Sequence, residues 1–123
     1  MPKPPSKYDV LYKKYSFLSN VYMFECGNGW FQLLSDLCAK LDALQLGPQF
    51  KVSQVKEKFA TLRFYVDDVP KDRQSEVNKL ISEAATKSAH TCEHCGKPGR
   101  QTSLGRGCYL ITLCGECEKQ ANA

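Results

Sequence analysis

Seven apolar side chains recur at the three- and four-residue spacing of an α-helix in the first half of the chain. They are Trp30, Leu33, Leu34, Leu37, Cys38, Leu41 and Leu44. Asn28 stands just before them, and its side-chain oxygen can accept a hydrogen bond from the amides of a first helical turn. Gly47 and Pro48 follow and stop a helix. We therefore predict a long helix, N-capped by Asn28, with one apolar face that must be buried.

A second helical pattern lies further along the chain. Its apolar positions are Val77, Leu80, Ile81, Ala84 and Ala85. Asp67, Asp68 and Pro70 precede the pattern, and acidic residues are favoured at the positive end of the helix dipole. The pattern predicts a second long helix that opens with these three residues and runs to about Ser88.

The N-terminal region predicts a short helix after a flexible tail over residues 1–6, where three of the first five residues are proline. Ser6 and Asp9 form an S-x-x-D capping pattern. Tyr8, Leu11, Tyr12 and Tyr15 then follow at helical spacing. Residues 16–20 favour a turn, and residues 21–24 an extended segment.

Two short strands are predicted between the long helices. In residues 62–66, Leu62, Phe64 and Val66 alternate with Arg63 and Tyr65, which is typical of a half-buried strand. Residues 52–56 alternate less regularly, which indicates a β-bulge. Residues 58–61 hold the turn between the strands.

Four cysteines in the last third of the chain have the spacing of metal ligands. Cys92 and Cys95 form one C-x2-C pair, and Cys114 and Cys117 form another after 18 intervening residues. Two such pairs can supply four sulfurs to one tetrahedral Zn²⁺, and four protein ligands leave no position for a catalytic water. We predict one structural zinc ion, with a redox-sensing or disulfide role as the alternative.

The other potential ligands fit this site less well. Cys26 and Cys38 are predicted to be core thiols, since a buried cysteine behaves as a small hydrophobic residue. Cys108 and His90 are the candidates for a replacement ligand, and His94 is expected on the surface. Neither histidine has a glutamate two residues later, as a zinc deaminase requires. No histidine follows His94, as a zinc-knuckle HNH nuclease would need. We therefore expect no enzymatic activity and no small-molecule substrate.

The overall prediction is an α+β fold, in which two long helices pack on a β-hairpin, followed by a four-cysteine zinc ribbon or treble-clef-like module. The domain boundaries are a tail over residues 1–6, an α+β body over 7–88 and a zinc-binding module over 89–123. A hydrophobic content of 42% suffices for a packed core. The apolar runs are too short to span a bilayer, and no secretory signal is recognised, so a cytoplasmic location without membrane contact is expected.

Net charge gives weak support to nucleic-acid binding. The formal charge is +4, but four thiolates and one Zn²⁺ contribute −2, so the zinc-bound chain carries about +2. One stretch is locally basic and aromatic, with Lys51, Lys56, Lys58 and Arg63 interleaved with Phe59 and Tyr65. We predict that Lys56, Lys58, Arg63 and Tyr65 form a partner-binding surface, the alternative being a solvated strand face.

Several segments resemble a known group of proteins. These segments are residues 25–30 (ECGNGW), 54–59 (QVKEKF), 62–65 (LRFY), 92–99 (CEHCGKPG) and 112–114 (TLC). Over residues 24–117 they are similar to small, uncharacterised zinc-binding proteins of tailed phages and prophages. Members usually have two glycines in place of Ala60 and Thr61, Asp in place of Asn28, Trp near Tyr109, and often His in place of Cys117. The last change preserves zinc chemistry.

Two functions follow as hypotheses. The resemblance implies a phage-type accessory protein, and the absence of a catalytic motif favours one that binds and modulates a host or defence protein in the host cytoplasm. The alternative is a nucleic-acid-binding accessory factor, because zinc ribbons often present basic hairpins. A macromolecular partner is expected in both cases, and the modest charge favours a protein over a nucleic acid.

Overall fold

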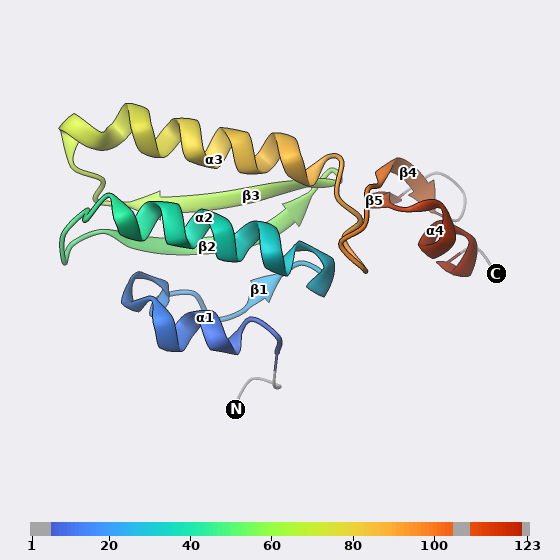
Figure 1. The fold of residues 1–123 in the computed structure, drawn as a ribbon, viewed down its shortest axis with the longest axis horizontal. Helices are drawn as coiled ribbons and strands as arrows, with labels where there is room; N and C mark the ends of the chain where they lie inside the picture. The colour runs from blue at the N-terminus through green and yellow to red at the C-terminus, as the bar shows by residue number, and fades with distance from the viewer. Residues whose placement is uncertain (1–5, 105–108, 122–123) are drawn as a thin grey trace.

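The computed structural model describes residues 6–104 and 109–121 of a mixed α/β chain (Figure 1). In chain order, with η for a 3₁₀ helix, its elements are α1 (Asp9–Lys14), η1 (Ser16–Leu18), β1 (Phe24–Glu25), η2 (Asn28–Trp30), α2 (Phe31–Ala43), β2 (Lys51–Lys58), β3 (Thr61–Asp67), η3 (Lys71–Arg73), α3 (Gln74–Ser88), β4 (Arg100–Leu104), β5 (Tyr109–Leu113) and α4 (Gly115–Ala121). Both long helices and both predicted strands are confirmed.

The larger sheet has three strands in the order β1-β2-β3 rather than two. β2 and β3 form the predicted antiparallel hairpin, and the register shifts between Val52 and Gln54, which confirms the bulge. β1 was predicted only as an extended segment over 21–24. It pairs in parallel with β2 through Phe24 and Glu25. Two residues are too few to show an alternating pattern in the sequence, so this pairing could not be predicted.

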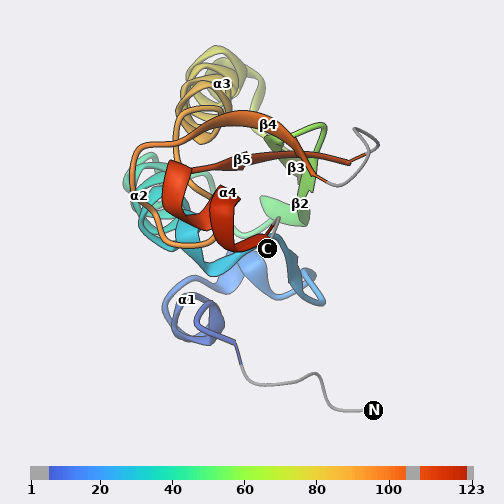
Figure 2. The same cartoon turned by 90° about the vertical axis from the view of Figure 1, so that its right-hand side faces the viewer.

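The long helices α2 and α3 cover one face of this sheet, and the other face carries no helix among the described residues (Figures 1 and 2). The buried positions of α2 are Leu33, Leu34, Leu37, Cys38 and Leu41. Opposite them, Val52, Val55, Leu62 and Phe64 point inward from the strands. In α3, Val77 and Ala84 are buried, while Leu80 and Ile81 pack at the margin of the core. The core therefore lies between the two helices and one face of the sheet.

The short helix α1 closes the remaining edge of this core. Ser6 and Asp9 interact as the capping pattern predicts on one side only: the Ser6 amide donates to Asp9 Oδ2 at 3.0 Å, and Ser6 Oγ accepts from the Tyr8 amide at 3.1 Å. The N-cap position of α1 is Tyr8, which has no side-chain cap. The Tyr8 ring stacks on Phe24 with 4.4 Å between centroids. Its hydroxyl donates to the carbonyl of Gly27 at 2.7 Å, which ties α1 to the turn before α2.

Asn28 is not the N-cap of α2, so this prediction was wrong. Asn28 begins the 3₁₀ turn η2, and neither η2 nor α2 has a side-chain cap. The amides of this turn are satisfied from a distant segment instead: Gly27 N–H donates to Glu93 Oε2 at 2.8 Å, and Gly29 N–H donates to the Glu93 carbonyl at 2.7 Å. Glu93 thus takes the role that the local sequence assigned to Asn28.

The start of the second long helix also differs from the prediction. Asp67 is the last residue of β3, and Asp68 has a φ of 58°, in the left-handed region. The helical conformation begins with η3 after Pro70, and α3 itself begins at Gln74. The acidic residues near its beginning are Asp72 and Glu76, so the preference for negative charge there is still met.

The turn of the β2–β3 hairpin contacts the cysteine-containing part of the chain. Phe59 and Ala60 both have positive φ, 52° and 67°, as a two-residue hairpin turn requires. Ala60 is fully buried, and its carbonyl accepts a hydrogen bond from Thr112 Oγ1 at 2.7 Å. The carbonyl of Phe59 faces Gln101 Nε2 at 3.5 Å. The backbone of the hairpin tip therefore lies against β4 and β5, while the Phe59 side chain is 64% exposed.

A second contact between the two parts of the chain runs through the start of α2. The indole N–H of Trp30 donates to the carbonyl of Thr91 at 2.9 Å, and the indole is fully buried. A Cβ atom on Gly29 would lie 2.2 Å from the carbonyl oxygen of Cys92, and one on Gly27 would lie 2.4 Å from that of Glu93. Glycine at both positions is therefore what lets the two backbones meet.

Among the described residues, no helix has the length and apolar character needed to cross a bilayer.

We expect Trp30→Ala to lower the free energy of unfolding by about 3 to 5 kcal/mol, because it removes a buried aromatic ring and leaves a cavity. Urea denaturation followed by far-ultraviolet circular dichroism measures this change. Tyr22→Ala is the control, since Tyr22 is 64% exposed and its loss should change the stability by less than about 0.5 kcal/mol. Equal effects of the two substitutions would contradict the placement of Trp30.

Gly29→Ala should destabilise the protein by about 1 to 3 kcal/mol, the usual effect of overpacking, since the added methyl group meets the backbone of Cys92. Gly115→Ala is the matched control, because a Cβ atom there meets nothing within 4 Å. The same denaturation experiment compares the two variants. A Gly29→Ala protein as stable as Gly115→Ala would show that the two backbones are not in close contact.

Candidate metal centre

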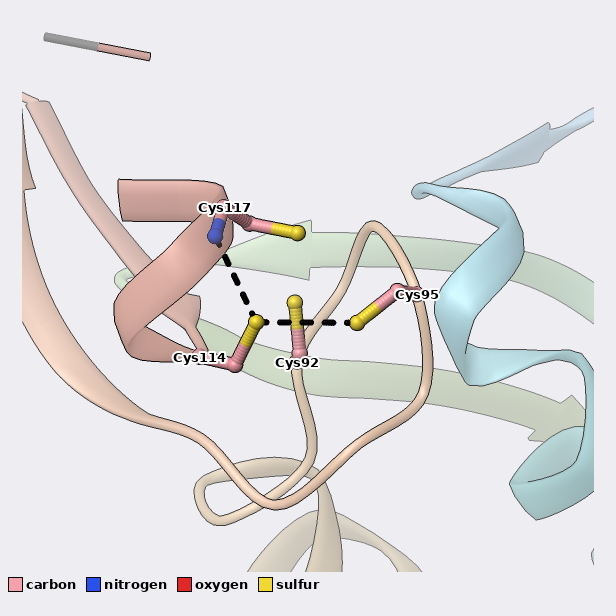
Figure 3. Close-up of side chains that lie close together, drawn as sticks. All are labelled: Cys92, Cys95, Cys114 and Cys117. Atoms are coloured by element: carbon pink, nitrogen blue, oxygen red, sulfur yellow. Dashed lines mark hydrogen bonds between the residues drawn. The ribbon is translucent and has the colours of Figure 1, made fainter. Parts of the chain in front are cut away.

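Cys92, Cys95, Cys114 and Cys117 come together at one point of the C-terminal part of the chain (Figure 3). Cys92 and Cys95 lie on the loop that follows α3. Cys114 lies directly after β5, and Cys117 lies in α4. The antiparallel β4–β5 pair brings the second cysteine pair back beside the first, and the isolated bridge between Thr91 and Pro98 closes the loop. The sequence pattern predicted no strand in the segment that forms β4.

The four sulfur atoms have the separation of a metal-ligand set. All lie within 4.8 Å of one another, and Cys95 Sγ is 3.6 Å from Cys114 Sγ. Sulfurs about 2.3 Å from a tetrahedral ion are about 3.8 Å apart. The four cysteines can therefore hold one metal ion after a small contraction of the longest separations.

The loop around the first pair is fixed by its own backbone. Cys92 N–H donates to the carbonyl of Lys97 at 2.7 Å, and Gly96 N–H donates to the carbonyl of Cys92 at 2.9 Å. Gly96 has a φ of +84°, a conformation that side chains disfavour, and it lies against the backbone of Gly29. These contacts hold the two sulfurs of the loop on the side that faces α4.

The electrostatics of the cluster favour a bound cation. Burial opposes ionisation of Cys92, but hydrogen bonds from the backbone of Cys114, Cys95 and His94 lower the pKa of its thiol to about 6. Hydrogen bonding with Cys114 raises the pKa of Cys117 to about 12, and the charge of Cys92 adds to this effect. One thiolate thus suppresses ionisation of its neighbours, and a cation among the sulfurs would relieve that repulsion.

A small apolar cluster packs against the cysteines. Cys92, Ile111 and Leu113 are buried together, with Leu104 and two of the other cysteines packed at their margin. Glu118 fastens α4 to β4, because Thr102 Oγ1 donates to its carboxylate at 3.0 Å and Arg100 Nη2 lies 3.5 Å from it. The residues between and after the ligands therefore form a separate core around the sulfurs.

The remaining predicted ligands stay apart from the cluster. His90 and His94 are exposed, and the metal-competent group found in the described part of the chain contains cysteines only. Cys108 lies outside the described residues. Cys38 is buried and Cys26 is half-buried, and burial raises the pKa of both thiols to about 12. The prediction of a core thiol is confirmed for Cys38, whereas Cys26 packs at the margin of the core.

The predicted partner-binding residues lie on the sheet face that no helix covers. Lys56 is directly opposite Arg63 in the β2–β3 register, and Tyr65 is opposite Gln54. Lys58 follows two residues after Lys56, and alternate residues of a strand share a face. Arg63, Tyr65 and Lys58 are exposed, and Lys56 is half-buried. The structure therefore brings all four onto one surface.

Glu93 is the important residue that the sequence analysis missed. It is 6% exposed, and burial raises the pKa of its carboxyl group. Its Oε2 atom accepts a hydrogen bond from the Gly27 amide, while Oε1 has no hydrogen-bond partner among the residues that the structure describes. The available signals were an acidic residue between two ligand cysteines and the Gly-Asn-Gly turn far upstream. Nothing in the sequence alone links these two segments.

Comparison with protein-family models, with curated proteins and with solved structures finds no match to this chain. The interpretation of the metal centre therefore rests on its own geometry.

Proposed function

We propose that this protein is a non-enzymatic accessory protein that binds a macromolecular partner and that one structural Zn²⁺ holds its C-terminal module in place. The observation that carries the proposal is the set of four cysteines, which lie within 4.8 Å of one another and fill a tetrahedral site without leaving a position for water. In this proposal the zinc supplies structure and no chemistry.

Zinc is the metal that best fits the donor set. Four thiolates are soft ligands and suit Zn²⁺, and the chain's order of elements supports a treble-clef-like module. The first ligand pair lies on a loop, the β4–β5 hairpin follows, and α4 carries the last ligand near its beginning. A disulfide or redox role, the other hypothesis for these cysteines, would not call for all four sulfurs to converge.

The bound metal would also order the surface of the body. It would fix Cys92, and hence Glu93, whose carboxylate and carbonyl bind the amides of Gly27 and Gly29. Through β5 it would fix Thr112, which binds the carbonyl of Ala60 at the hairpin tip. The zinc site would thereby hold the β2–β3 hairpin and the start of α2 in one geometry.

The partner-binding surface in this proposal is the exposed face around Arg63 and Tyr65. Tyr65 is 45% exposed although it lies in the middle of a strand, and Arg63 is exposed beside it. Leu62 and Phe64 of the same strand form the core, so the fold does not use the two exposed side chains. Arginine and tyrosine are residue types that often dominate the energy of an interface.

The resemblance to phage and prophage proteins suggests that the partner is a host or defence protein, bound and modulated in the host cytoplasm. The basic side chains Lys56, Lys58 and Arg63 give specific support to the second candidate, a nucleic-acid-binding accessory factor. Salt dependence separates the two, because nucleic-acid affinity falls steeply with salt through counterion release. Nuclease treatment before a pull-down gives an independent answer.

We expect one Zn²⁺ per chain by elemental mass spectrometry, and no stoichiometric zinc in Cys114→Ser. Metal binding contributes about 10 to 16 kcal/mol to small zinc modules, so Cys114→Ser or chelation should unfold residues 90–120. The helical signal of the body should largely remain, since its core is separate from that of the module. Cys26→Ser is the control and should keep its zinc. Loss of all helicity on chelation would show one cooperative unit and contradict the predicted domain boundaries.

The double substitution Arg63→Ala, Tyr65→Ala should weaken partner capture by more than about 1 kcal/mol without changing the zinc content or the melting temperature. The two side chains lie outside the core, which is why the fold should tolerate the change. Capture from host-cell extract, quantified by mass spectrometry, measures the effect. Full capture by the double variant would exclude this face, and turnover of a nucleotide or nucleic acid by the purified protein would exclude a purely binding role.

A further inference from the structure

We propose that the helix-free face of the β1-β2-β3 sheet binds a short acidic segment of a protein partner, whose carboxylates contact Lys56, Lys58 and Arg63. This inference rests on the proposed binding function and goes further by naming the chemistry of the partner. It is carried by the positions of the charged side chains on the three strands.

The first observation is a pair of like charges in direct opposition. Lys56 and Arg63 are paired across the antiparallel strands, an arrangement that destabilises a sheet when no anion is present. The ion pairs found among the described residues, Arg73–Glu76 and Arg100–Glu118, involve neither of them and do not involve Lys58. The ion pairs in the described part of the chain therefore leave these three cations unengaged, although Glu25 lies next to Lys56 in the β1–β2 register.

The second observation is how closely these cations are grouped. Directly opposite residues of an antiparallel pair have Cβ atoms about 5 Å apart, and alternate residues of one strand are about 7 Å apart. Lys56, Arg63 and Lys58 therefore form a compact triangle. This spacing suits two or three carboxylates on alternate residues of an extended segment, and the arginine can hold one of them through two parallel hydrogen bonds.

The third observation is that negative charge bounds the triangle. Glu25 lies on the edge strand β1, next to Lys56 of β2, and its carboxylate accepts a hydrogen bond from Gln54 at 3.0 Å. At the other end of the hairpin, Asp67 lies opposite Lys51. A nucleic-acid strand needs a continuous basic track along its phosphates, and here the track would meet Glu25 and Asp67. A short acidic segment can contact Arg63 and Lys58 without reaching Asp67, and Glu25 beside Lys56 marks the edge of its site, so the short segment is favoured.

The fourth observation is the aromatic residue next to the triangle. Tyr65 is 45% exposed and lies on the same face, two residues after Arg63. Its ring can pack on the aliphatic part of a bound segment while the carboxylates reach the cations. Within strands β1, β2 and β3, Tyr65 is the exposed aromatic residue, and Phe59 at the hairpin tip is also exposed, with Lys58 Nζ 5.7 Å from the centroid of its ring. Base-stacking surfaces use several rings for successive bases along one track, and these two rings lie on different sides of the triangle.

The test is an NMR titration of the ¹⁵N-labelled zinc-bound protein with a peptide in which glutamate alternates with valine. The matched control peptide has glutamine at every glutamate. We expect the acidic peptide alone to shift the amide signals of β2 and β3. The shifts should disappear near 1 M salt, where the Debye length is about 3 Å. The dissociation constant of the acidic peptide should rise at least about fivefold in the double variant Lys56→Gln/Arg63→Gln, because two exposed ion pairs are removed.

Lys79→Gln is the control variant, since Lys79 is exposed on α3 and lies away from this face. The affinity of this variant for the acidic peptide should equal that of the parent protein. The inference is overturned if the acidic peptide causes no shifts, if the glutamine peptide causes the same shifts, or if oligothymidylate binds this face more tightly than the acidic peptide.

Failure of the inference can be told apart from failure of the proposed function. Suppose the double variant Arg63→Ala/Tyr65→Ala loses the cellular partner while the double variant Lys56→Gln/Arg63→Gln keeps it. The face then binds the partner, but the partner is not acidic. If both keep it, the proposed binding surface itself is wrong.

Discussion

The contact between Glu93 and the turn before α2 joins the two parts of this protein, and much of the remaining structure depends on it. One residue supplies a carboxylate oxygen to the amide of Gly27 and a carbonyl oxygen to the amide of Gly29. Because Glu93 directly follows the ligand Cys92, the position of the cysteine cluster and the start of α2 are set together. The buried indole of Trp30, bonded to Thr91, adds a second connection at the same junction.

This arrangement explains why a protein with a substantial core would benefit from a metal site. The body has its own hydrophobic core, and a smaller core surrounds the cysteines. The polar contacts between them, from Glu93 and Thr112, require a fixed C-terminal module. A closed four-sulfur site supplies that order without a large core of its own, as small domains often need. In the proposed function, the metal acts at a distance on the surface that binds the partner.

The binding surface follows from the same architecture. The long helices α2 and α3 lie on one side of a three-stranded sheet, and the opposite side is left without a helix among the described residues (Figure 2). A strand that is buried on one side only can carry side chains that the fold does not need. Lys56, Arg63 and Tyr65 occupy such positions, and the direct opposition of two cations is unfavourable until an anion arrives. These features are the basis for proposing that the surface binds a charged partner.

The sequence by itself determined every element whose signal is local and periodic. The apolar spacing of α2 and α3, the alternation in β3, the bulge in β2 and the two C-x2-C pairs each predicted their structure, because each depends on neighbours a few residues away. Only the tertiary structure decided the rest. β1 is too short to show a period, and β4 carries polar residues with no alternation. Asn28 is a residue type that is common at N-caps, but Glu93, 65 positions later, accepts the hydrogen bonds from the amides of this turn. Whether a polar group is satisfied by a neighbour or by a distant segment is settled when the chain packs, because the two compete for the same hydrogen bonds.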